Sequence, residues 1–327
     1  MIVLINATAA KNGGALTILN GFIESKERDK SNHYIVMSPI EPKKKYKNVT
    51  WIKKETSGIA TLLFTLFTSW FYCKFYKCEK IVSFSNINTL FPLKYKVSYF
   101  HNILIFEGKG VKYFILRNII KYFGKKSCVY IVQTSYVKKI FIEAAGYGYN
   151  IKICWPGISI HAPKSKASSN SYINKIDDGK LKILVPITNI HLVHKNFELV
   201  QSLADFLAGN NIVLIVTADS NLKLSNINFI GMQSRDSYLA LLDAVDATLI
   251  TSTFETLCLP IFESLVKNKP VYVYDAPYVD GLFDDFGTIP GLIRFNNEEN
   301  LKLKLSNFSK VDIDFEGDVY SPANWDF

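Results

Sequence analysis

Short apolar runs alternate along the chain with longer segments in which apolar residues repeat at the spacing of one helix face. Runs of this length, bounded by polar or glycine-containing stretches, are typical of strands buried on both faces of a parallel sheet. In the first half, strands are expected at residues 2–5, 34–37, 81–84, 97–100, 128–132 and 151–154, and helices at residues 15–25, 59–71, 112–123 and 136–144. The alternation predicts an α/β fold with helices on both faces of the sheet.

The pattern is interrupted over residues 161–179. This segment gains Ser, Lys and Asn and loses its periodicity, which is typical of a linker. A chain of 327 residues is also long for one domain. The predicted organisation is an N-terminal doubly wound domain over residues 1–160, the linker, a second doubly wound domain over residues 180–310, and a C-terminal tail over residues 311–327.

The same alternation restarts after the linker. Strands are expected at residues 181–186, 212–216, 228–230, 247–250 and 271–274, and helices at residues 195–207, 236–243 and 260–266. Two doubly wound domains leave a cleft between the carboxyl ends of their strands, where such sheets bind ligands. Functional residues are therefore expected on the loops that follow strands.

Composition narrows the class of protein. Hydrophobic residues make up 48% and charged residues 20%, which excludes a disordered or collagen-like chain. With 5 His and 5 Cys and neither a C-x2-C pair nor an H-E-x-x-H motif, there is little material for a metal site. The apolar start lacks a basic leader, so no signal peptide is expected, and the cysteines are expected to be free thiols in a reducing compartment. The apolar stretch of residues 59–73 spans ~22 Å as a helix, short of the ~30 Å hydrocarbon core.

The charge is divided unequally between the two halves. Residues 1–150 carry 23 Lys+Arg against 8 Asp+Glu, and residues 151–327 carry 15 against 21, so the halves have net charges of +15 and −6. This asymmetry predicts an anionic partner for the N-terminal half, such as a membrane surface or a phosphorylated substrate. A nucleic acid is the alternative, although the sequence contains no recognisable nucleic-acid-binding motif.

The densest group of candidate residues runs from Ala247 to Glu263, closes with residues 268–275, and reads as strand, loop, helix and strand. Pro260 suits the first turn of a helix, where its missing N–H costs nothing. The preceding amides, those of residues 257–259, are then available to an anion. Glu255 lies in the loop and Glu263 in the helix, and both carboxylates could face the ligand.

This segment resembles the donor-binding segment of the retaining glycosyltransferases of family 4, which have a Glu-x7-Glu motif with a Pro between the two Glu residues. The resemblance covers most of the chain. It extends to residues 185–189 followed by His194 and Lys195, to His101 after the strand at residues 97–100, and to residues 132–134, which are similar to an element of O-antigen enzymes. It implies a GT-B fold, with two Rossmann-like domains facing each other across a cleft.

The resemblance implies a site and a reaction. A sugar would pass from a UDP-, GDP- or dTDP-linked donor to a polyprenyl-diphosphate-linked or oligosaccharide acceptor, as in O-antigen or other surface-polysaccharide synthesis, without a metal or cofactor. Lys195 and the loop amides would hold the diphosphate, Glu263 the ribose, and Glu255 and His101 the sugar. The implied catalytic residues are Glu255 and His101, and the implied donor-binding residues are Lys195, Glu263, Thr256, Leu257, Cys258, Leu259, Gly13, Gly14 and Asn189.

Two positions depart from the family pattern. Cys258 stands where the family usually has Gly, and the Arg that often precedes the phosphate-binding Lys is absent, with Thr188 and Asn189 in that region. These departures keep open the alternative that the chain is a non-catalytic GT-B subunit that binds a partner transferase.

A basic helix is predicted in the N-terminal half. Arg117, Lys121 and Lys125 recur every four residues, and Leu116, Ile119, Ile120 and Phe123 are expected on the opposite face. Aromatic and basic residues also mix over residues 70–77, a composition that interfacial segments use. We therefore expect reversible contact with an anionic membrane, at the cytoplasmic face of the plasma membrane, and no contact with nucleic acid.

Overall fold

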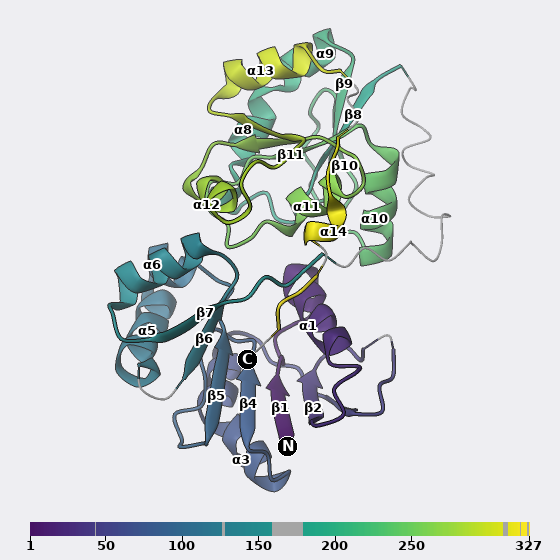
Figure 1. The fold of residues 1–327 in the computed structure, drawn as a ribbon. Helices are drawn as coiled ribbons and strands as arrows, with labels where there is room; N and C mark the ends of the chain where they lie inside the picture. Colours follow the sequence, from purple (N-terminus) through teal and green to yellow (C-terminus); the bar gives the residue numbers. More distant parts are fainter. Residues whose placement is uncertain (43, 126–127, 159–178, 310–312, 321, 326) are drawn as a thin grey trace. The chain divides into compact units, whose positions relative to one another are not determined.

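The computed structural model describes residues 1–42, 44–125, 128–158, 179–309, 313–320, 322–325 and 327. It divides into two compact units (Figure 1): residues 1–157 together with 322–327 form the N-terminal unit, and residues 158–321 form the C-terminal unit. Most of the expected linker, residues 161–178, lies outside the described residues.

The N-terminal unit is built on a parallel sheet of 7 strands in the order β3-β2-β1-β4-β5-β6-β7. Its strands are β1 (Ile2–Asn6), β2 (His33–Ser38), β3 (Val49–Lys53), β4 (Lys80–Ser83), β5 (Tyr95–Tyr99), β6 (Val129–Val132) and β7 (Asn150–Ile153). Its helices are α1 (Gly13–Ser25), α2 (Gly58–Leu63), the π-helical turn η1 (Phe64–Thr68), α3 (Ser69–Phe75), α4 (Leu104–Glu107), α5 (Val111–Ile119), the π-helical turn η2 (Ile120–Gly124) and α6 (Ser135–Ala145). The chain reverses its direction of travel across the sheet after β3, as in doubly wound folds.

Alternate residues of each central strand enter different cores, because successive side chains of a strand point to opposite faces. On one face, Val3 and Ile5 of β1 pack against α1. On the other face, Leu4 of β1 packs against the helical segment α2–η1–α3. Helical elements η2 and α6 also pack on this second face of the sheet, where they bury Tyr130 and Val132 of β6.

The segment α2–η1–α3, Gly58–Phe75, is the one helical segment among the described residues that is long and apolar enough to cross a membrane by length and composition. One side of this segment nevertheless packs against the sheet of the N-terminal unit. Phe64, Leu66 and Cys73 are buried against the sheet, and the buried Thr65 hydroxyl accepts a hydrogen bond of 3.0 Å from Asn6 Nδ2. The segment therefore provides the cover for β1 and β4.

The C-terminal unit contains a parallel sheet of 6 strands in the order β10-β9-β8-β11-β12-β13. Its strands are β8 (Leu181–Val185), β9 (Ile212–Val216), β10 (Ile227–Phe229), β11 (Ala247–Ile250), β12 (Val271–Tyr274) and β13 (Leu292–Phe295). Its helical elements are the 3₁₀ turn η3 (Val193–Lys195), α8 (Phe197–Ser202), α9 (Ala204–Gly209), α10 (Arg235–Ala244), α11 (Leu259–Leu265), α12 (Pro277–Phe286), α13 (Glu298–Ser306) and α14 (Gly317–Tyr320). Helices α8, α9 and α13 cover one face, and α10 lies on the other.

The central strands lie where the apolar pattern predicts them, whereas the edge strands β3 and β13 were not expected. Strand β3 is only partly buried and mixes Thr50 and Lys53 with apolar residues, and β13 contains Arg294. An edge strand with one solvated side has no continuous apolar run, so it lacks the signal that marks a buried parallel strand.

The end of the chain returns to the N-terminal unit. Trp325 is 3% exposed, and its ring packs edge-on against Phe22 of α1 at 5.4 Å and lies 5.8 Å from Tyr99 of β5. Phe327 stacks on Phe22 at 5.7 Å. The Lys26 ammonium donates a hydrogen bond of 2.9 Å to the Trp325 carbonyl oxygen. These residues complete the core between α1 and the sheet.

We predict that Trp325→Ala lowers the free energy of unfolding of the N-terminal unit by about 3 kcal/mol, because it leaves a cavity beside Phe22 and Tyr99. The measurement is urea denaturation followed by circular dichroism. Leu303→Ala, at a side chain 61% exposed in the other unit, is the control and should change stability by less than about 0.5 kcal/mol. Equal stability of the two variants would contradict the packing described here.

Candidate functional site

Lys195 and Glu255 form an ion pair at the carboxyl edge of the C-terminal sheet. Lys195 follows β8 at the end of η3, and Glu255 follows β11, the parallel neighbour of β8. Lys195 Nζ lies 2.5 Å from Glu255 Oε1, and the two side chains are 22% and 18% exposed. Because the carboxyl ends of parallel neighbours meet at one edge, residues 60 positions apart are brought together here.

Hydrogen bonds from the loop after β11 hold the turn that carries Lys195. The Thr251 hydroxyl donates to the Lys195 carbonyl oxygen at 2.6 Å, and the Thr253 amide donates to the His194 carbonyl oxygen at 2.8 Å. The expectation that Lys195 opens a helix is wrong. Asn196 has a left-handed backbone with φ of 51°, which separates η3 from α8, and the helix begins at Phe197.

The Lys195 ammonium stays charged. Burial, the largest single effect, lowers the pKa of Lys195, but the charge and hydrogen bond of Glu255 together with the nearby Cys258 outweigh it, and the net shift is upward from 10.5. His194 shows the opposite effect, since burial and the neighbouring ammonium both lower its pKa. The Lys195 ammonium is therefore a fixed positive charge, and an anionic ligand would compete with Glu255 for it.

Glu263 is buried within the C-terminal unit, although the sequence suggested that its carboxylate faces a ligand. It is 2% exposed, and its Oε1 lies 2.6 Å from Nη1 of Arg235. Burial raises the pKa of Glu263, and Arg235 opposes that rise. Sequence reasoning missed Arg235. One feature of the sequence could have indicated it: Arg235 directly follows Ser234, whose hydroxyl caps the start of α10. A long side chain at the first residue of α10 can reach the neighbouring helix α11.

Two tyrosines lie near Glu255 and Glu263. The Tyr278 hydroxyl is buried without a hydrogen-bond partner among the described residues, whereas the Tyr238 hydroxyl interacts with the Glu263 carboxylate. Burial raises the pKa of Tyr238, with the charge of Glu263 adding to the rise, and burial also raises that of Tyr278. An unsatisfied buried hydroxyl costs roughly 1 to 3 kcal/mol.

Cys258 occupies a left-handed position, with φ of 53° and ψ of 62°, at the residue before α11. This geometry explains why Gly suits the position, since only Gly adopts it without steric cost. Thr256, Leu257 and Leu259 lie in the same loop or at the helix start, and Leu257 is 4% exposed. Pro260 lies at the beginning of α11, as expected from the sequence.

The remaining predicted donor residues follow β1 of the N-terminal unit and β8 of the C-terminal unit. Gly13 and Gly14 open α1 after β1, and Gly13 has φ of 58°. A Cβ at either glycine would meet nothing within 4 Å, so packing does not require a glycine there. Asn189 is exposed after β8, where its Oδ1 accepts a hydrogen bond of 2.9 Å from the His191 amide.

His101 follows β5 in the N-terminal unit. Its amide donates to Asn86 Oδ1 at 2.8 Å, and its ring centroid lies 6.1 Å from that of Tyr99. Burial lowers the pKa of His101 to about 4, so the imidazole is neutral at pH 7. A neutral imidazole can accept or donate a hydrogen bond but carries no charge for a phosphate.

The three residues of the predicted basic stripe differ in their surroundings. Arg117 donates to the carbonyl oxygens of Phe106 at 2.7 Å and Gly108 at 3.3 Å, so it holds the loop between α4 and α5. Lys121 and Lys125 are exposed. Phe123, expected on the buried face, is 57% exposed because the π-helical turn η2 shifts the helix face at this point.

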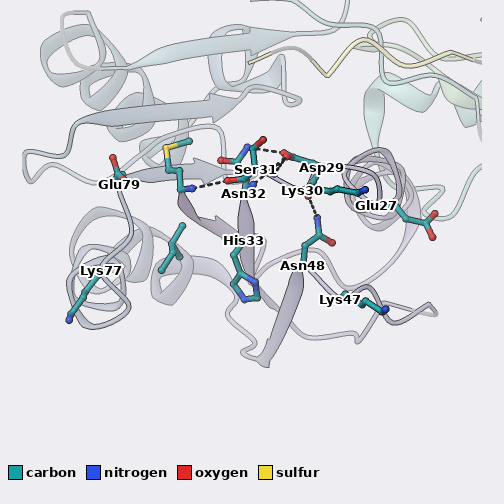
Figure 2. Close-up of a pocket in the computed structure, with 12 residues that line it drawn as sticks. Glu27, Asp29, Lys30, Ser31, Asn32, His33, Lys47, Asn48, Lys77 and Glu79 are labelled. Atoms are coloured by element: carbon teal, nitrogen blue, oxygen red, sulfur yellow. Dashed lines mark hydrogen bonds between the residues drawn. The ribbon is translucent and has the colours of Figure 1, made fainter.

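A pocket of about 680 Å³ lies at the opposite, amino edge of the N-terminal sheet (Figure 2). Its Asp29 carboxylate is already bound within the chain: it accepts hydrogen bonds from the Ser31 and Asn32 amides and from the Tyr34 hydroxyl. These bonds, that from Tyr34 first, lower the pKa of Asp29 to about 2. Parallel sheets bind ligands at their carboxyl ends, so this pocket is not the candidate site.

The part of the chain that the structure describes contains no group of three or more His, Cys, Asp or Glu side chains positioned to hold a metal ion. The five cysteines are free and buried. Charge at the candidate site is instead balanced by the ion pairs Lys195–Glu255 and Arg235–Glu263.

The two sheets and their interleaved helices define a GT-B fold, as expected, and solved glycosyltransferase structures share it. No family model matches the sequence, and no curated protein matches it by sequence. Membership of family 4 and the role of the Glu-x7-Glu motif stay predictions.

Three of these structures show the extent of the similarity. The structure of Anabaena HepE in complex with UDP and glucose has a TM-score of 0.66 and 17% identity, and covers 94% of this chain and 89% of that chain. WaaG, a glycosyltransferase involved in lipopolysaccharide biosynthesis, has a TM-score of 0.65 and 16% identity, with coverages of 94% and 90%. WaaB, a lipopolysaccharide outer core galactosyltransferase, has a TM-score of 0.55 and 13% identity, with coverages of 98% and 93%.

We predict that Cys258→Gly is more stable than Cys258→Ala by about 1 kcal/mol, because both lose the thiol but only Ala keeps the steric cost of the left-handed backbone. Denaturation midpoints of the two variants give this difference. An exposed position in the middle of a helix, Lys139 of α6, provides the control, since there Ala should exceed Gly by roughly 1 kcal/mol. The usual order of Ala above Gly at Cys258 would rule out the left-handed conformation.

We predict that Arg235→Met lowers the free energy of unfolding by about 3 kcal/mol at pH 7, because it leaves the buried Glu263 carboxylate without its cation. Burial already holds the pKa of Glu263 above 4.5, and loss of Arg235 raises it further. The contribution of this group is then greatest below pH 4.5 and is lost as the pH rises through the folded-state pKa. The measurement is denaturation as a function of pH.

The matched control for Arg235→Met is the double variant Arg235→Met/Glu263→Gln. Its amide carries no charge, so the added loss of stability with rising pH should disappear. If the single and double variants show the same pH dependence, Arg235 does not neutralise Glu263.

Proposed function

We propose that the chain is a glycosyltransferase that binds a nucleoside-diphosphate sugar at the carboxyl edge of its C-terminal sheet. The observation that carries the proposal is the Lys195–Glu255 pair, a fixed ammonium held by two loops at that edge. One further observation supports it: HepE, a structure with the same fold, was solved with UDP and glucose.

In this proposal, Lys195 neutralises the diphosphate of the donor as it departs. Breaking the bond between the sugar and the diphosphate leaves negative charge on phosphate oxygens, and a positioned ammonium stabilises that charge where it develops. The loop amides from Thr256 to Leu259 add donors to the same group. Glu255, released from Lys195 when the diphosphate takes its place, becomes free to accept hydrogen bonds from sugar hydroxyls.

The finer parts of the proposal rest on the resemblance to family 4. They are retention of configuration at the sugar carbon, contact of Glu263 with the ribose, contact of His101, Gly13, Gly14 and Asn189 with the donor, and a polyprenyl-diphosphate-linked oligosaccharide acceptor in O-antigen or other surface-polysaccharide synthesis. The neutral His101 suits a hydrogen bond to a sugar hydroxyl better than a contact with phosphate. For Glu263 to reach a ribose, the carboxylate has to share its hydrogen-bonding capacity between the ligand and Arg235.

We predict that Lys195→Ala weakens binding of the nucleoside diphosphate by roughly 10- to 100-fold, the scale of a hydrogen bond to a charged group of about 1.5 to 3 kcal/mol. Glu255→Gln should bind the nucleotide at least as well as the wild type, because it removes the anion that competes for Lys195, but its turnover should fall. Calorimetric titration with UDP, GDP, dTDP and CMP measures the affinities, and sugar transfer measured with and without EDTA gives the turnover.

The control variant is Lys302→Ala, which removes an ammonium of α13 that pairs with Glu298 and Glu299. It should bind nucleotide as the wild type does. Unchanged affinity in Lys195→Ala would overturn the placement of the diphosphate. Nucleotide binding without any transfer or donor hydrolysis would favour the non-catalytic subunit, and loss of transfer in EDTA would mean that a metal does what we assign to Lys195.

A further inference from the structure

An apolar stripe runs along the outer side of the helical segment Gly58–Phe75. Its members are spaced four residues apart and are exposed by 75%, 51%, 39%, 59% and 78% for Ile59, Leu63, Phe67, Phe71 and Phe75 respectively. We call these five residues the outer stripe. Monomeric proteins rarely expose contiguous apolar surface of this kind without a partner for it.

The π-helical turn η1 keeps the outer stripe on one side of the segment. A four-residue repeat drifts around a helix with 3.6 residues per turn, so its members would move progressively toward the buried face. The wider turn at Phe64–Thr68 takes up additional residues and reduces this drift. The exposed and buried faces therefore stay separate along the whole segment.

Aromatic side chains brace the middle of the outer stripe. Trp70 lies 5.2 Å from Phe71 and 4.9 Å from Phe91 between ring centroids, and its Nε1 donates a hydrogen bond of 3.1 Å to the Pro92 carbonyl oxygen. The Lys74 ammonium lies 5.4 Å from the centre of the Trp70 ring. A braced platform of this kind loses little conformational freedom when it is covered.

The charge around the outer stripe has one sign. Residues 56–78 contain no Asp or Glu, and the exposed Lys74 and Lys77 lie at their end. Residues 108–142, which include α5 and η2, also contain none. Both helical segments pack on the same buried cluster, through Leu66 and Ile120. On α5 and η2, the exposed side chains are again apolar or basic: Lys112, Phe114, Lys121, Tyr122 and Phe123.

We propose that the outer stripe docks on an anionic lipid bilayer, with its aliphatic and aromatic side chains in the headgroup and acyl boundary and the flanking lysines at the anionic headgroups. A second copy of this chain would present the same lysines and is repelled. The segment lies on the bilayer and does not span it, because Phe64, Leu66 and Cys73 belong to the core of the N-terminal unit. Arg117 contributes structure to this unit, and the binding charge comes from exposed lysines.

This inference does not depend on the proposed function, because vesicle binding needs neither nucleotide nor acceptor. The experiment is sedimentation of the full-length protein with vesicles of phosphatidylglycerol and phosphatidylcholine, or of phosphatidylcholine alone, at ~0.1 M salt. The test variant is Phe71→Ser/Phe75→Ser, and the matched control is Leu222→Ser/Leu303→Ser, which changes two exposed apolar residues of the C-terminal unit. Circular dichroism establishes that each variant is folded.

The wild type and the control should pellet with the anionic vesicles and much less with the neutral ones, whereas the test variant should bind the anionic vesicles about tenfold more weakly. Lys74→Gln/Lys77→Gln should reduce binding and its dependence on salt. Equal binding of the test variant and the wild type would overturn the proposal. Two other results would also overturn it. Insertion that resists extraction would indicate a helix that spans the bilayer. A concentration-dependent dimer in light scattering, abolished in the test variant, would indicate that a second copy of the chain covers the outer stripe.

Discussion

The two ion pairs of the C-terminal unit place charge where the sheet alone would provide only apolar side chains and backbone. Lys195 reaches across from the end of β8 to Glu255 after β11, and Arg235 reaches from α10 to the buried Glu263 of α11. Removal of either cation would leave a carboxylate in a place of low polarity, which is costly. The need of these charges for partners therefore ties the loop after β8 to the loop after β11, and α10 to α11.

The two ion pairs differ in how much of each is exposed to solvent. Glu263 is almost completely enclosed, so its pair with Arg235 joins two helices on one face of the sheet. The Lys195–Glu255 pair retains some exposure, so it is the more accessible of the two pairs to an incoming anion. A bound diphosphate would convert an internal pair into an intermolecular one.

The central strands and the loops that follow them could be predicted from the sequence because a buried parallel strand is apolar throughout. The partners of the buried charges could not. Nothing in the spacing of Arg235 and Glu263 indicates that α10 and α11 bring them to 2.6 Å, since this depends on how helices pack. The left-handed backbone of Cys258 and the exposed Phe123 likewise result from local departures from regular helix geometry, which periodicity does not report.

The return of residues 322–327 to the N-terminal unit makes the C-terminal unit an insertion within the other one in terms of chain connectivity. During synthesis, the sheet of the N-terminal unit emerges first, but the aromatic ring that covers Phe22 is made only after residues 158–321. Until then, α1 exposes part of its apolar face, which chaperones and proteases can recognise. The core of the N-terminal unit is thus completed only after the C-terminal unit has been synthesised.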